Sequence, residues 1–142
     1  MAASYSLGVY LVWFESVIRK ETGCVTYLVG ADGGDCVVFD PLWDIEPYLE
    51  IARHRSSKIR YVIDSHSHAD HVSGARRLTA ATSGELILPD LAEVTYEASR
   101  VKGGDELEMD DVTLRVVHVP GHRPEQINIA VIDRSRGDDP WC

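Results

Sequence analysis

The chain has 142 residues, of which 44% are hydrophobic and 26% charged, and its formal net charge is −9. The length limits the chain to a single domain, and the composition is ordinary for a soluble protein. Because the chain is acidic and has no basic stripe, we expect no nucleic-acid partner. No apolar stretch approaches the ~20 residues of a membrane span. The three cysteines show no CxxC spacing, so we expect a cytoplasmic protein with no membrane partner and no disulfide framework.

Short runs of β-branched and aromatic residues alternate with two amphipathic segments of helical spacing. This alternation predicts an α/β protein built in layers rather than a helical bundle or an all-β barrel. Residues 91–100 are expected to form one or two helical turns. The predicted helices cover 45–54, with Asp44 as N-cap, and 73–81; the predicted strands cover 9–14, 24–29, 36–40, 59–63, 86–88, 106–109, 112–119 and 127–133.

Several residues have ordinary structural interpretations. His54 ends the first predicted helix beside two arginines, so we expect it at the surface. Arg76 and Arg77 are expected to be exposed on the second predicted helix. Cys24 and Cys36 lie in apolar runs and are expected in the core.

A dense group of potential metal ligands follows the strand predicted at 59–63. His66 and His68 are two residues apart, so an extended backbone points both imidazoles to one side. Asp70 and His71 follow after the chain has begun to turn and can point elsewhere. Imidazole and carboxylate ligands suit zinc, iron or manganese better than calcium or magnesium. The spacing therefore predicts two neighbouring metal positions on one loop.

A second candidate loop follows the strand predicted at 112–119. A Pro-Gly pair ends that strand and places His122 at a strand end, as in the first loop. His118 lies within the strand and is expected to be structural or to support a ligand. Asp40 and Asp64 lie at the ends of two other strands, where they could contact the ligands.

The motif His66-x-His68-x-Asp70-His71 resembles the signature of the metallo-β-lactamase superfamily. The segments 39–41, 47–49 and 68–76 are similar to one branch, the persulfide dioxygenases (sulfur dioxygenases) and their rhodanese-associated relatives. Glyoxalase II enzymes share the motif but usually carry a bulky aromatic residue where Ala69 stands. The resemblance implies the αββα layered fold of that family, with a mixed sheet and helices on its outer face.

This resemblance covers residues 14–142, about the N-terminal half of a usual domain, and it implies an extension outside the family pattern at 1–13. A carboxylate ligand of the family falls beyond residue 142. The chain is therefore expected to be a truncated form of a longer protein, or half of a homodimer that completes the site in trans. A catalytically inactive remnant that binds metal weakly or not at all is an alternative to an enzyme.

The resemblance also implies two alternative enzymatic functions, each with a small thiol, persulfide or thioester substrate. In both, the family pattern adds His122 to the metal ligands. A persulfide dioxygenase of sulfur metabolism holds one Fe(II) on His68, His122 and the later carboxylate, with His66, Asp70 and His71 close by, and oxidises glutathione persulfide to sulfite and glutathione. A glyoxalase II-type thioester or ester hydrolase binds one Zn(II) on His66, His68 and His122 and a second on Asp70 and His71. There Asp70 is also catalytic, because it helps to orient the attacking hydroxide.

Overall fold

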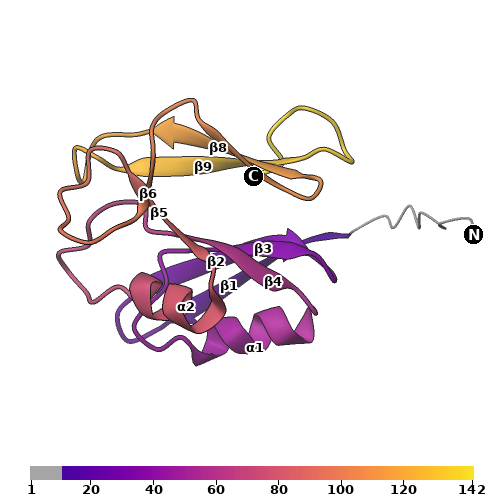
Figure 1. Cartoon of the computed structure of the whole chain (residues 1–142), viewed down its shortest axis with the longest axis horizontal. Helices are drawn as coiled ribbons and strands as arrows, with labels where there is room; N and C mark the ends of the chain where they lie inside the picture. The colour runs from indigo at the N-terminus through magenta and orange to yellow at the C-terminus, as the bar shows by residue number, and fades with distance from the viewer. Residues whose placement is uncertain (1–10) are drawn as a thin grey trace, which may run out of the picture.

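Residues 11–142 are described by the structure, a computed structural model in which two short helices and two β-sheets form layers (Figure 1). The described elements, in chain order, are β1 (Val12–Arg19), β2 (Cys24–Ala31), β3 (Asp35–Phe39), α1 (Glu46–His54), β4 (Lys58–Ile63), α2 (Ala75–Thr82), β5 (Glu85–Pro89), β6 (Ser99–Val101), β7 (Glu106–Met109), β8 (Val112–His118) and β9 (Ile127–Asp133).

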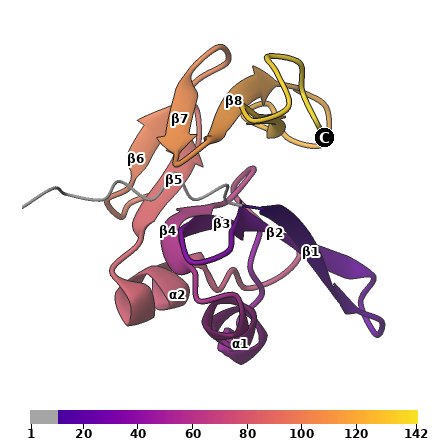
Figure 2. The same cartoon turned by 90° about the vertical axis from the view of Figure 1, so that its right-hand side faces the viewer.

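The larger sheet has the order β1-β2-β3-β4-β5-β6 and is mixed because two kinds of connection build it. Tight turns join β1, β2 and β3, which are antiparallel, whereas helical crossovers join β3, β4 and β5, which are parallel. Both crossover helices lie on the same face of this sheet (Figure 2). The carboxyl ends of β3 and β4 therefore meet at one edge, where Asp40 and residues 64–71 follow.

Alternation along the strands divides the core into two apolar layers. Val38 and Val62 point to the helices and pack in one cluster with Tyr48 and Leu78. The opposite face packs on the antiparallel sheet β7-β8-β9 in a second cluster. Its members from the two sheets include Val37, Tyr61, Ile63, Ile87, Met109, Leu114, Val116, Ile127 and Val131. The order helix, sheet, sheet confirms the predicted layered fold and its restriction to half of the αββα arrangement.

The prediction of helical turns at 91–100 is wrong. Residues 91–98 form turns and bends, and Ser99–Val101 adds the parallel edge strand β6 to β5. The Arg100 guanidinium donates to the carbonyls of Pro89 (3.2 Å) and Ala92 (2.8 Å). Pairing with an open sheet edge therefore outweighs the helical propensity of this segment.

The N-cap of α1 also differs from the prediction. Ile45 occupies that position without a side-chain cap, and Asp44 accepts only a long bond, 3.4 Å, from the Glu46 backbone N–H. The Ile45 side chain is buried in the helix-side core. Apolar packing therefore determines where this helix begins.

The exposure of individual side chains agrees with most of the remaining predictions. His54, Arg76 and Arg77 are exposed and Cys36 is buried, as expected. Cys24 is only half-buried, which corrects its predicted core position, because it begins β2 beside the hairpin turn. Residues 1–10, which include most of the predicted extension 1–13 and the start of the predicted strand 9–14, lie outside the described residues. Neither described helix has the length and apolar character that a membrane crossing needs.

Tyr48 connects the helix layer to the edge of the sheet where Asp40 lies. Its hydroxyl is buried, accepts from the Leu42 backbone N–H at 2.9 Å and donates to Thr26 Oγ1 at 3.0 Å. Thr26 Oγ1 in turn donates to the Asp40 carbonyl at 2.9 Å.

We expect Tyr48→Phe to lower the free energy of unfolding by about 1–3 kcal/mol, because the buried Leu42 N–H loses its acceptor. Urea unfolding monitored by circular dichroism measures the change. Tyr27→Phe is the matched control, since Tyr27 is exposed. Equal losses in the two variants would contradict the role of the Tyr48 hydroxyl.

Candidate metal centre

Two loops that lie far apart in the sequence bring four imidazole rings together. The loop after β4 carries His66, His68 and His71, and the loop after β8 carries His122. The centroid of the His66 ring lies 4.2 Å from that of His68 and 5.0 Å from that of His122. The centroids of His68 and His71 are 4.3 Å apart. The four histidines that the sequence predicts as metal ligands therefore belong to one cluster.

Asp40 ties the first loop to the end of β3. Its backbone has a left-handed φ of 50°, which aspartate tolerates better than most residues. One carboxylate oxygen, Oδ1, accepts from the Ser65 backbone N–H at 2.7 Å and from His68 Nε2 at 3.0 Å. The other, Oδ2, accepts from the Ser65 hydroxyl at 2.7 Å. The sequence anticipates this supporting role for Asp40 but not its partner Ser65.

These hydrogen bonds determine which ring nitrogens are free for a cation. Because the Ser65 hydroxyl gives its one proton to Asp40, it accepts from His66 Nδ1, at 2.9 Å. A neutral His66 therefore keeps its lone pair on Nε2. In the same way, the bond from His68 Nε2 to Asp40 leaves the lone pair of a neutral His68 on Nδ1. Metal-binding histidines usually have such a carboxylate or hydroxyl partner on the nitrogen that does not bind the metal.

Asp64 adds a second buried carboxylate beside His68. Its Oδ1 lies 3.5 Å from His68 Nε2, and both of its oxygens accept from the Ser73 hydroxyl. Burial alone would lower the pKa of His68, but the hydrogen bonds to Asp40 and Asp64 raise it to about 10. Burial and the neighbouring charge of His68 lower the pKa of His66.

Asp70 and His71 form the outer part of the cluster. Asp70 Oδ1 accepts from His71 Nδ1 at 3.0 Å, and the Asp70 side chain is 67% exposed. His71 Nε2 is buried and has no hydrogen-bond partner in the described chain. A buried nitrogen lone pair without a donor is costly, and a cation would satisfy it.

The donor set therefore fits a transition-metal ion. Potential ligand atoms lie within 4.8 Å of one another in two groups that share His68: one with Asp70 and His71, the other with Asp40 and Asp64. Both carboxylates of the second group already accept hydrogen bonds, which favours a supporting role for them. His68 and His71 are then candidate ligands from the first group, and His66 and His122, which belong to neither group, are candidates through the contacts of their rings.

The second loop contains a buried carboxylate, Glu125, that no sequence motif indicates. Glu125 is 4% exposed and accepts from Ser67, which lies between two candidate ligands. Burial raises its pKa, but the hydrogen bonds from Ser67 lower it to about 2. Nothing in the local sequence distinguishes Glu125, two residues before β9, from an exposed loop carboxylate. His118 Nε2 donates to the Pro124 carbonyl at 2.8 Å, which agrees with its predicted structural role.

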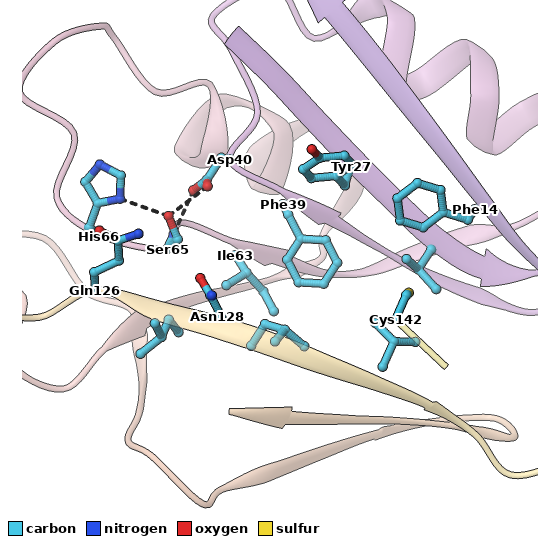
Figure 3. A pocket seen from close by; sticks show the side chains of 14 residues that line it. Phe14, Tyr27, Phe39, Asp40, Ile63, Ser65, His66, Gln126, Asn128 and Cys142 are labelled. Atoms are coloured by element: carbon cyan, nitrogen blue, oxygen red, sulfur yellow. Dashed lines mark hydrogen bonds between the residues drawn. The ribbon is translucent and has the colours of Figure 1, made fainter. Parts of the chain in front are cut away.

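A cleft between the two sheets opens beside His66 (Figure 3). Its volume is about 430 Å³. Asp40, Ser65, His66 and Gln126 lie at one end, and Phe14, Tyr27, Phe39 and Cys142 line the other. The cluster therefore adjoins an apolar space large enough for a small molecule.

A helix–sheet–sheet fold with histidine loops meeting at the edge between its sheets defines a class of layered α/β proteins built around a metal site. The chain belongs to the metallo-beta-lactamase superfamily, whose family model matches residues 19–135. This match confirms the family that the histidine motif indicates.

Relatives include proteins of both predicted activities. A hydroxyacylglutathione hydrolase of Methylobacillus flagellatus is 34% identical over 91 residues, covering 63% of this chain and 36% of that protein. Human mitochondrial persulfide dioxygenase ETHE1 is 24% identical over 113 residues, covering 78% of this chain and 44% of that protein. The chain thus spans less than half the length of these two relatives.

Two solved structures share the fold. A metallo-beta-lactamase from Staphylococcus aureus superposes with a TM-score of 0.81 at 25% identity, over 89% of this chain and 40% of that one. ETHE1 from Myxococcus xanthus superposes with a TM-score of 0.76 at 24% identity, over 84% of this chain and 53% of that one.

His68 makes the stability of the metal-free chain depend on pH. Its pKa of about 10 in the folded chain exceeds the ordinary value of 6.5. Its contribution to stability is therefore complete below pH 6.5 and is lost as the pH rises towards 10. We expect the free energy of unfolding of the chelator-treated chain, measured in urea, to decline over this range, and His68→Gln to reduce the decline.

The exposed His54 provides the control for this titration. His54→Gln should retain the full decline in stability between pH 6.5 and 9, where few other side chains titrate. A decline of the same size in the His68→Gln variant would show that Asp40 and Asp64 do not hold the His68 proton.

Proposed function

We propose that this chain carries the metal-binding half of an enzyme that transforms the sulfur group of a small thiol-derived substrate, as persulfide dioxygenases do. The observation that carries the proposal is the contact of the His66 ring with the rings of both His68 and His122, beside an apolar cleft. Ala69, which stands where glyoxalase II enzymes usually carry a bulky aromatic residue, favours the dioxygenase over the hydrolase.

The histidine pair for a single Fe(II) is better chosen as His66 and His122 than as His68 and His122. The His66 ring contacts that of His122, with centroids 5.0 Å apart, whereas Asp40 and Asp64 hold on His68 a proton that a metal would have to displace. Iron, when bound, would supply the redox chemistry that joins oxygen to sulfur. The chain's own residues keep His66 and His68 in the required tautomers through Ser65 and Asp40, and the cleft offers apolar walls to the substrate.

A second candidate function is thioester hydrolysis with two Zn(II) ions. The observation that favours it is the outer group of His68, Asp70 and His71, whose ligand atoms lie within 4.8 Å of one another. The identity of 34% to a hydroxyacylglutathione hydrolase also supports it. In this function His66, His68 and His122 would hold the first ion, and Asp70 would bind the second and orient the attacking water.

Metal content and substrate preference distinguish these functions. We expect the chain, reconstituted without oxygen, to bind one Fe(II) by elemental analysis and to consume oxygen when glutathione persulfide is added. Two Zn(II) per chain and cleavage of a glutathione thioester would support the hydrolase instead. A chain that binds no metal and turns over neither substrate would be an inactive remnant and would overturn the proposal.

Single histidine variants test the ligand assignment in the same experiment. His66→Ala and His122→Ala should each weaken metal binding by more than the roughly 10–100-fold that loss of a supporting residue costs. His54→Ala is the control and should leave metal content unchanged, because His54 is exposed at the end of α1. Full metal content in His122→Ala would show that the second loop does not contribute a ligand.

A further inference from the structure

The two histidine loops are joined by one buried carboxylate. Glu125 Oε1 accepts from the Ser67 backbone N–H at 3.1 Å, from the Ser67 hydroxyl at 2.5 Å and from Arg123 Nε at 3.3 Å. Arg123 also donates to the Ser67 hydroxyl, at 3.1 Å. Among the described residues, the side-chain hydrogen bonds between these loops all belong to this group of Glu125, Ser67 and Arg123, called here the Glu125 network.

The residues of the network are close in sequence to the candidate ligands on both loops. Ser67 lies between His66 and His68, and Glu125 lies three residues after His122. One backbone bond, from the Ile127 N–H at the start of β9 to the Ser65 carbonyl at 3.0 Å, also joins the first loop to the end of the second. The cross-loop bonds at Ser65 and Ser67 therefore stand on either side of His66.

Neither loop has regular secondary structure that would hold it in place. Residues 119–126 form an irregular connection between β8 and β9, and residues 64–71 form bends after β4. Ligands on irregular segments need supporting contacts to stay within a fraction of an ångström of a metal geometry. Glu125 supplies such a contact, since its side chain is almost completely buried while Arg123 remains half-exposed.

We propose that Glu125 is a positioning residue that sets the separation between His122 and the His66/His68 pair. It acts through the Ser67 backbone and hydroxyl, not as a ligand. The inference rests on the metal centre of the proposed function but on neither of the two reactions.

The test measures Co(II) binding to the full chain by titration and by its visible absorption spectrum, alongside urea unfolding of the metal-free chain. We expect Glu125→Ala to weaken Co(II) binding at least tenfold and to change the spectrum. Glu125→Gln should recover most of the affinity, because the glutamine Oε1 can accept the same hydrogen bonds.

Asp133 offers a closely matched control at the opposite end of β9. Its buried carboxylate accepts from the Ser135 backbone N–H and hydroxyl and from Arg136 Nε, as Glu125 does from Ser67 and Arg123. Six residues of strand, ~20 Å, separate it from the start of β9 at the site. Asp133→Ala should therefore reduce stability without changing Co(II) affinity or the spectrum.

Each outcome distinguishes the inference from the function on which it rests. Wild-type affinity and spectrum in Glu125→Ala, or an equal loss of Co(II) affinity in Asp133→Ala, would overturn the positioning role. A wild-type chain that binds Co(II) but, loaded with iron or zinc, transforms neither substrate would overturn the proposed function alone. A wild-type chain that binds no Co(II) would overturn both.

Discussion

The carboxylate of Asp40 is the contact on which the geometry of the histidine cluster depends. It accepts three hydrogen bonds from the loop after β4, two from Ser65 and one from His68. Its own backbone is held by the Thr26 hydroxyl, which bonds to the buried Tyr48. The packing of α1 against the sheet is thereby transmitted through Tyr48 and Asp40 to the tautomers of His66 and His68.

The same contacts explain why the cluster suits a cation better than water. Burial lowers the pKa of His66, so its ring is neutral at pH 7 and offers a lone pair. His71 Nε2 is buried without a donor, a deficit of about 1–3 kcal/mol by the usual cost of an unpaired buried polar group. A divalent ion beside His66 would use the first lone pair and one beside His71 would relieve the second deficit. Coordination by His68 would release the proton that Asp40 and Asp64 retain. Folding and metal binding are in this way coupled through one group of side chains.

Local sequence signals predict the elements and the ligands, but not the contacts between distant segments. Runs of β-branched and aromatic residues identify β3, β4 and β8, and turn residues place Asp40 and His122 at strand ends. Nothing local indicates that Ser99–Val101 pairs with β5 in preference to forming helical turns, since the sheet edge that stabilises it is ten or more residues away. Ser67 and Glu125 are 58 positions apart, so their contact exists only once both sheets have formed. The predicted Asp44 N-cap is wrong for the same reason, because the helix start depends on the packing of Ile45 in the core formed with the sheet.

The two ends of the cluster are not held with equal precision. His66 is flanked by cross-loop bonds at Ser65 and Ser67, and its ring is tied to Asp40 through the Ser65 hydroxyl. Asp70, in contrast, is 67% exposed, and its side-chain hydrogen bond is to the adjacent His71. A ligand held by several buried bonds loses less conformational entropy when a metal binds than one free in solvent. The chain's contacts therefore preorganise His66 for a metal more than they preorganise Asp70.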